Sequence, residues 1–261
     1  MKAIDLETHL RKIGTWVNYK NTTDYFHAGD PNTDVTGIAV AWQGRLPALK
    51  KAVGLGCNLL VTHEQIDYPE PQIARKGEIQ PYAAEKRKFI EDSKLVIYRC
   101  HDMWDRMPKI GIVPAWADFL GLDEPLVFEE VEAVVYKSPK PSLPELARYV
   151  LAKVRPLGQD SVEMVGDPDA RITRVAIGCG AGTVYPTAVR HGADAFVGSD
   201  DGMRYWADGS WALDRGFPLV LVNHCTTEEP GMMSLAKYLG EQFPGVKVTH
   251  IPQGCMYRTV G

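Results

Sequence analysis

Short apolar runs alternate with amphipathic segments along this chain, and this alternation constrains the fold more than any other feature. Runs such as NLLVT (58–62) and PLVLVN (218–223) are typical of short strands that are buried in a sheet. Between such runs, apolar residues recur at helical spacing, as in the first segment with Leu6, Leu10 and Ile13. The alternation predicts an α/β architecture.

The pattern predicts nine strands and six helices. The expected strands are 36–41, 58–62, 94–99, 130–136, 161–165, 171–177, 195–197, 218–223 and 247–251. The expected helices are 5–17, 46–53, 82–93, 142–154, 183–191 and 232–243. Ser142 fits the N-cap of its helix, with Glu145 as its partner three residues later.

Composition excludes several classes of protein. Hydrophobic residues make up 45% and charged residues 24% of the 261, which are globular values, so global disorder is excluded. The net charge of −4 argues against a nucleic-acid or membrane-surface partner. No apolar run is long enough to span a bilayer, and residues 1–14 have no secretory apolar core. Five scattered cysteines without a CxxC pair predict a reduced, cytoplasmic protein.

Three apolar runs end in the same way, with a histidine that is followed closely by an acid. The three segments are LLVTHE with His63 and Glu64, VIYRCHDMWD with His101 and Asp105, and VLVNHCTTEE with His224 and Glu228. Ligands gather beyond the carboxyl ends of strands in open α/β sheets. Imidazole and carboxylate groups suit zinc, iron or manganese, so these strand ends predict a metal site.

The spacing and number of these residues indicate two ions. His101 and Asp105, like His224 and Glu228, are four residues apart, which places both side chains on one face of a helical turn. Six ligands exceed one tetrahedral ion but suit two metals that share a carboxylate and a water. The alternative for any single histidine is a capping or hydrogen-bonded group without metal.

The blocks LPALKKAVGLGCNLLVTHE, YRCHDMWD and VNHCTTEEPGMMSLAKYL, in this order, resemble the Nif-three-like family, often labelled GTP cyclohydrolase I type 2 homologues. The stretch VAIGCGAGTVYPTAVRHGADAFVGSDD resembles the intervening loop, helix and strand of that family. The resemblance covers essentially the whole chain. It implies metal ligands at His63, His101, Asp105, His224 and Glu228, and a homo-oligomer that is typically a hexameric ring.

Two positions depart from the family pattern. Glu64 stands where the family usually has a second histidine, and it remains a plausible ligand of changed type. The segment GSDDGMRYW (198–206) lacks the histidine that usually follows an acid there. If the centre contains the carboxylates of Glu64, Asp105 and Glu228, two divalent ions and one hydroxide, its net charge is zero. With a histidine at position 64 the net charge would be +1. This predicts a less electrophilic centre, a harder metal preference and weaker attraction for anions.

The resulting hypothesis is a dinuclear metal-dependent hydrolase that acts on a small molecule through a metal-bridging hydroxide. The family label suggests a purine nucleotide as the substrate. Glu228 is the expected bridging carboxylate. Asp201, with Asp200, is a candidate general acid/base, although strand-end aspartates also cap helices. The alternative is a metal-binding or metal-handling protein that interacts with partners without turnover, which the missing histidine favours.

Several weaker signals remain open. The GCGAG turn (178–182) could bind a nucleotide phosphate or be only a tight strand-to-helix turn. Cys100 and Cys225 adjoin candidate ligands but are expected to be small buried residues. Trp104 and Trp206 are candidate pocket residues, and the candidate cations for an anionic substrate are Arg106, Lys109 and Arg204.

The expected organisation is two α/β units with the metal site at strand ends. Residues 1–124 with 219–261 are expected to form the metal-binding unit, because His224 and Glu228 must return to His63 and His101. Residues 125–218 are expected to form the second unit, and the boundary is the turn at 122–125.

Overall fold

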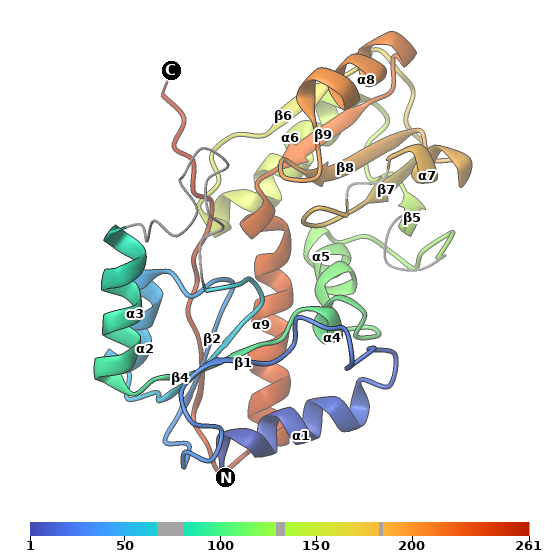
Figure 1. Cartoon of the computed structure of the whole chain (residues 1–261). Helices are drawn as coiled ribbons and strands as arrows, with labels where there is room; N and C mark the ends of the chain where they lie inside the picture. The colour runs from blue at the N-terminus through green and yellow to red at the C-terminus, as the bar shows by residue number, and fades with distance from the viewer. Residues whose placement is uncertain (67–80, 129–133, 183–184, 261) are drawn as a thin grey trace. The chain divides into compact units, whose positions relative to one another are not determined.

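The computed structural model describes residues 1–66, 81–128, 134–182 and 185–260. The chain divides into two compact units, and each contains a five-stranded sheet with helices (Figure 1). Unit 1 comprises residues 1–107 and 232–253, and unit 2 comprises residues 108–231 and 254–261. The predicted α/β class is confirmed.

Unit 1 contains a mostly parallel sheet. Its elements are α1 (Ala3–Ile13), β1 (Phe26–Ala28), β2 (Ile38–Ala41), α2 (Leu46–Gly54), β3 (Leu59–Thr62), α3 (Pro81–Ser93), β4 (Val96–Arg99), α4 (Asp102–Asp105), the later part of α9 (His224–Gln242) and β10 (Val248–His250). The strand order is β1-β4-β3-β2-β10, and only the edge strand β1 is antiparallel to its neighbour.

Both faces of the unit 1 sheet are covered. Leu60 and Ile97 pack with Leu49 of α2 and Ile90 of α3 in one apolar cluster. The neighbouring residues along β2, β3 and β4 point to the opposite face and are also buried. In Figure 1 the strands lie between α2 and α3 on one side and the later part of α9 on the other. This burial explains why these strands read as continuous apolar runs.

Unit 2 contains the second sheet, in the order β5-β7-β8-β9-β6. Its elements are α5 (Ile112–Leu120), β5 (Val134–Lys137), α6 (Leu143–Val154), the 3₁₀ turn η1 (Arg155–Leu157), β6 (Glu163–Val165), β7 (Arg174–Ile177), α7 (Tyr185–Arg190), β8 (Ala195–Ser199), the π-helical turn η2 (Tyr205–Gly209), α8 (Ser210–Arg215), β9 (Leu219–Val222) and the start of α9. The central strands β7, β8 and β9 are parallel, and the edge strands β5 and β6 are antiparallel.

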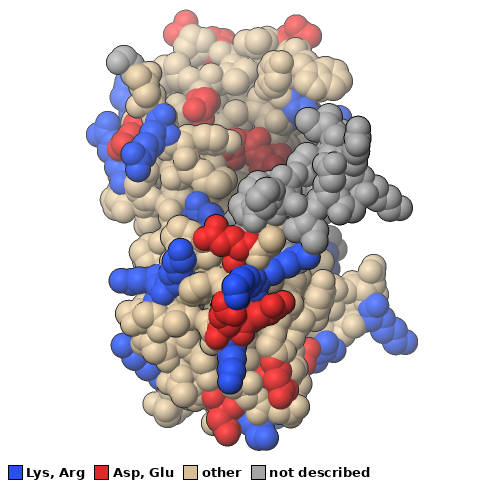
Figure 2. Space-filling view, turned by 60° about the vertical axis from the view of Figure 1, so that its left-hand side comes forward, with Lys and Arg blue, Asp and Glu red and all other residues tan. Residues whose placement is uncertain are grey.

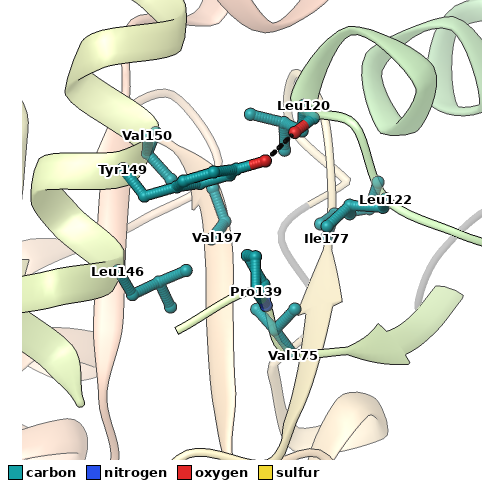
Figure 3. A pocket seen from close by; sticks show the side chains of 9 residues that line it. All are labelled: Leu120, Leu122, Pro139, Leu146, Tyr149, Val150, Val175, Ile177 and Val197. Atoms are coloured by element: carbon teal, nitrogen blue, oxygen red, sulfur yellow. Dashed lines mark hydrogen bonds between the residues drawn. The ribbon is translucent and has the colours of Figure 1, made fainter. Parts of the chain in front are cut away.

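Helices cover both faces of this sheet as well. Phe196 of β8 packs in an apolar cluster with Tyr185 of α7 and Ala212 of α8. On the other face, α6 and the end of α5 close over β7 and β8 around a small space that only apolar side chains and Tyr149 line (Figure 3). The Tyr149 hydroxyl donates to the Leu120 carbonyl at 2.5 Å, so its polar group is satisfied inside this layer.

The extents of the two units differ from the predicted ranges. Residues 108–124 and 219–231 lie in unit 2, because α5 packs against α6 and β9 pairs with β8 and β6. Residues 232–253 belong to unit 1, where β10 pairs with β2. His224 and Glu228 therefore belong to unit 2, whereas His63 and His101 belong to unit 1.

The predicted helix 232–243 is the later part of a longer one. Helix α9 begins at His224, where the Asp200 carboxylate accepts the backbone N–H of His224 at 2.8 Å. Pro230 lies inside the helix, a position where proline usually causes a kink or a break. The pattern missed the short elements β1, α4, α5 and α8. Parts of the predicted strand 130–136 and helix 183–191 lie outside the described residues.

On the face shown in Figure 2, lysine and arginine side chains lie in small groups mixed with aspartate and glutamate. No helix in the described part of the chain combines the length and apolar character that a membrane span requires.

Candidate metal centre

The ends of β3 and β4 bring the predicted ligands of unit 1 together. These parallel strands are neighbours, with Thr62 opposite Arg99, so the residues that follow them lie at the same sheet edge. One ligand atom from each of His63, Glu64 and His101 lies within 4.8 Å of the other two. The two imidazole rings stack with their centroids 4.4 Å apart. The turn after β3 is fixed because the N–H groups of His63 and Glu64 both donate to the Trp42 carbonyl.

The short helix α4 adds Asp105 to this group. Asp105 Oδ1 lies 3.4 Å from His63 Nε2, and Asp105 Oδ2 lies 3.2 Å from His101 Nδ1. His101 and Asp105 share one face of the helical turn, as their spacing predicts. Unit 1 thus gathers two imidazoles and two carboxylates, which we call the first ligand group: His63, Glu64, His101 and Asp105.

A buried carboxylate holds the start of α4 in place. Asp24 is fully buried, and its oxygens accept the backbone N–H groups of His101, Asp102 and Met103 at 2.6, 2.9 and 2.8 Å. Burial raises the pKa of Asp24, although these three donors favour the charged form. Because this carboxylate replaces the missing partners of the helix N-terminus, it fixes the direction in which the first turn presents His101 and Asp105.

The second ligand group consists of His224 and Glu228 on the first turn of α9. His224 Nε2 lies 3.0 Å from Glu228 Oε2, and the Glu228 side chain is almost completely buried. The residues that follow β8 support this turn, because Asp200 accepts the His224 N–H and Asp201 Oδ2 lies 3.0 Å from His224 Nδ1. Asp201 therefore contacts the ring of a predicted ligand, which is the geometry of a positioning residue.

All three candidate histidines share one arrangement. The Nδ1 atom faces an oxygen acceptor, which is the Cys100 carbonyl for His63 (3.3 Å), Asp102 for His101 (3.0 Å) and Asp201 for His224 (3.0 Å). The hydrogen bond with His101, followed by those from Thr22 and Thr23, holds the pKa of Asp102 below its ordinary value. An acceptor on Nδ1 selects the tautomer whose Nε2 carries no proton and can bind a metal, and metal-bound histidines usually have such an acceptor.

The glycine-rich loop 178–182 follows β7 and lies against the second ligand group. Gly180 has a φ of +54°, and a Cβ built on it would lie 2.5 Å from Glu228 Oε1 and 2.8 Å from His224 Nε2. Only glycine fits this approach, so the loop is part of the wall of the site. A carboxylate this close does not favour binding of a phosphate group by the loop itself.

Comparison with known proteins identifies the family. The model of the Duf34/NIF3 (NGG1p interacting factor 3) family matches residues 6–254. The chain belongs to the Duf34/NIF3 family. Two curated relatives, both named GTP cyclohydrolase 1 type 2 homolog, come from Halobacterium salinarum and Chlamydia pneumoniae. The Halobacterium salinarum relative is 28% identical, and the match covers 82% of this chain and 83% of that protein. The Chlamydia pneumoniae relative is 25% identical, and the match covers 94% of this chain and 95% of that protein.

A solved structure supports the same fold. The Staphylococcus aureus hypothetical protein SA1388 is 21% identical, and the match covers 100% of this chain and 99% of that chain with a TM-score of 0.79. The match to the family model confirms the predicted family resemblance, and the similarity to SA1388 shows a shared fold.

The donor chemistry of this Duf34/NIF3 protein fits divalent metal ions. The two ligand groups contain only imidazole nitrogens and carboxylate oxygens, and buried carboxylates such as Glu228 are stabilised by a nearby cation. The pattern suits zinc, iron or manganese.

Two cysteines and two tryptophans were also candidate site residues. Cys100 and Cys225 are fully buried, and burial raises the pKa of Cys100, so neither thiol is suited to act as a nucleophile. Trp104 is fully buried next to Tyr238, so it contributes to the core. Trp206 is exposed.

The candidate cations Arg106, Lys109 and Arg204 are all exposed, and Arg204 also pairs with Asp208 at 3.3 Å. No local sequence pattern indicated the role of Asp24 or the contact between Gly180 and the second ligand group. Asp24 lies 77 residues before His101, and the distance between them in the sequence hides the contact.

Gly180→Ala is expected to reduce metal binding by the second ligand group at least about 10-fold, because the new methyl group displaces Glu228 or His224. The matched control is Gly158→Ala. Gly158 also has a positive φ, +83°, but open space around it, so this variant carries only the backbone cost of about 1–2 kcal/mol. Isothermal titration with Zn²⁺ and Mn²⁺ measures the effect. Equal metal affinity of both variants would contradict it.

Proposed function

We propose that this protein is a metal-dependent hydrolase of a small molecule, with a purine nucleotide as the first substrate class to test. The proposal keeps the arrangement predicted from the sequence, in which six side chains hold two divalent ions. The ligands are His63, Glu64, His101, Asp105, His224 and Glu228. The strongest support is the shared arrangement of the three histidines, each with an acceptor on Nδ1. The printed name of the curated relatives suggests the nucleotide.

The chain's own residues have distinct tasks in this proposal. The Cys100 carbonyl, Asp102 and Asp201 orient the imidazoles, and the Glu228 carboxylate would help to hold the metal ions. When bound, two divalent ions lower the pKa of a water molecule toward neutrality and polarise the bond under attack. The exposed Arg106 and Lys109 supply positive charge for an anionic substrate.

The experiment that tests the proposal begins with the metal content of protein purified without chelators. We expect about two transition ions per chain. The protein is then assayed against GTP, other nucleotides and phosphoesters, after removal of metal and after its return. Hydrolysis that disappears with the metal and returns with it supports the proposal. A protein that binds no metal would reject it.

A second candidate is a metal-handling protein without turnover. It is favoured by the segment 198–206, which has no histidine and whose Asp201 is engaged with His224. Stoichiometric metal binding without hydrolysis of any compound in the panel would support this candidate.

We also propose that the protein forms a homo-oligomer, with a hexamer as the expected form. Multi-angle light scattering, which measures the mass of the particle in solution, tests this proposal.

Asp201→Asn is expected to lower the metal affinity of the second ligand group about 10- to 100-fold, because the amide no longer fixes the tautomer and charge of His224. The matched control is Asp214→Asn on the exposed face of α8. Competition with a chromophoric chelator measures the affinity. Asp201→Asn with the affinity of the control would mean that Asp201 has no positioning role.

A further inference from the structure

Arg99, the last residue of β4, contacts both residues that follow β3. Its Nε donates to the His63 carbonyl at 2.8 Å, and its Nη2 donates to Glu64 Oε2 at 3.2 Å. The side chain of Arg99 is 11% exposed and that of Glu64 19%, so solvent screens this ion pair less than an exposed one. The backbone contact at His63 holds the guanidinium in place.

The two carboxylate oxygens of Glu64 face different partners. Oε2 faces Arg99, whereas Oε1 lies 3.8 Å from His101 Nε2, on the side of the first ligand group. A carboxylate that binds a guanidinium through one oxygen can bind a metal ion only through its other oxygen. The ion then gains one oxygen ligand instead of two, and the charge of that ligand is offset by Arg99.

We propose that Arg99 makes Glu64 act toward the metal as a one-oxygen ligand without net charge, and thereby sets the metal preference of the first ligand group. The inference rests on the proposed function, because it requires that this group binds metal. It changes the charge balance derived from the sequence. A centre that contains both Glu64 and Arg99 has the same charge as one with a histidine at position 64 and no arginine at position 99.

The consequence is a preference that the ligand types alone would not give. A free carboxylate with two available oxygens favours hard ions such as Mn²⁺, whereas sites rich in imidazole with few oxygen contacts suit Zn²⁺. Arg99 therefore shifts the first ligand group away from Mn²⁺ and toward Zn²⁺. It also keeps positive charge near the site, which the earlier prediction of weak attraction for anions did not include.

The test compares the Zn²⁺ and Mn²⁺ dissociation constants of the parent protein, four variants at positions 64 and 99, and one control variant. Arg99→Gln removes the charge, and we expect Mn²⁺ to bind on the order of 10-fold tighter with a smaller change for Zn²⁺. Arg99→Lys keeps the charge and should stay near the parent. Glu64→His leaves Arg99 beside the ion without its carboxylate, and both metals should bind on the order of 10-fold more weakly. The double variant Glu64→His/Arg99→Gln should regain Zn²⁺ affinity.

The outcomes separate this inference from a merely structural role of Arg99. If Arg99 only supports the fold, Arg99→Gln weakens both metals equally, and the ratio of the two dissociation constants does not change. That result, or unchanged binding of both metals, overturns the inference. Arg11→Gln, which removes a surface arginine paired with Glu7, is the matched control and should leave both constants unchanged.

Two further results keep the test decisive. If Arg99→Gln does not fold, the comparison of Glu64→His with the double variant carries the test, and equal Zn²⁺ affinity of these two would overturn the inference. If the parent protein binds no metal, the proposed function itself fails. If the parent binds metal and the ratio is insensitive to Arg99, only the inference about Arg99 fails.

Discussion

His63→Ala is expected to lower the affinity of the first ligand group for metal on the order of 100-fold or more and to remove hydrolysis. His63 is fully buried, and its Nε2 lies among the carboxylates of that group. Loss of an outer partner of a ligand already costs 10- to 100-fold in such sites, so loss of a ligand itself costs at least as much. Metal content by mass spectrometry and the rate with the best substrate are the measurements.

Glu228→Ala is the corresponding change in the second ligand group and should remove hydrolysis as well. The matched control for His63→Ala is His191→Ala. His191 directly follows α7 and has no acid at ligand spacing. The control variant should keep both metal and activity. Turnover that survives both His63→Ala and Glu228→Ala would show that the hydrolase mechanism is wrong.

Asp24→Ala is expected to destabilise the protein by about 3 kcal/mol or more, because three backbone N–H groups at the start of α4 lose their buried acceptor. The same change releases His101 and Asp105, so binding by the first ligand group should weaken too. Urea unfolding followed by circular dichroism gives the free energy of unfolding, and titration with Zn²⁺ gives the affinity.

Two variants make this prediction specific. Asp24→Asn keeps one acceptor oxygen and should lose less stability than Asp24→Ala. Asp30→Ala removes an exposed aspartate that accepts the N–H of Asn32 in a surface turn, and it should cost only about 0.5 kcal/mol. If Asp24→Ala unfolds at the same urea concentration as Asp30→Ala, Asp24 does not hold the first turn of α4.

The sequence predicts the described strands other than β1, because a buried strand is a local apolar pattern. Burial on both faces makes β3 and β9 continuous apolar runs, and the spacing of four residues places His101 with Asp105 and His224 with Glu228. The long helix α9 was predicted too short, with a start at residue 232 instead of His224. The tertiary contact from Asp200 to the His224 N–H starts it.

The contacts that support the ligands could not be predicted from the sequence, because they join segments that are distant along the chain. Arg99 appeared only as the polar end of an apolar run, and its contact with Glu64 depends on the pairing of β3 with β4. The charge calculated for the centre omitted Arg99 for this reason. The approach of Gly180 to Glu228 likewise depends on how the loop after β7 folds against α9. Ligand types follow from local sequence, whereas their charge environment follows from packing.

The most direct test of the central claim is element-resolved X-ray scattering from a crystal grown without chelators and soaked with Zn²⁺ or Mn²⁺. It reports the number of ions, their identity and their ligands in one measurement. We expect two ions, with His63, Glu64, His101 and Asp105 among the ligands of one and His224 and Glu228 among those of the other or shared by both. Anomalous signal absent from these six side chains after soaking would contradict the account.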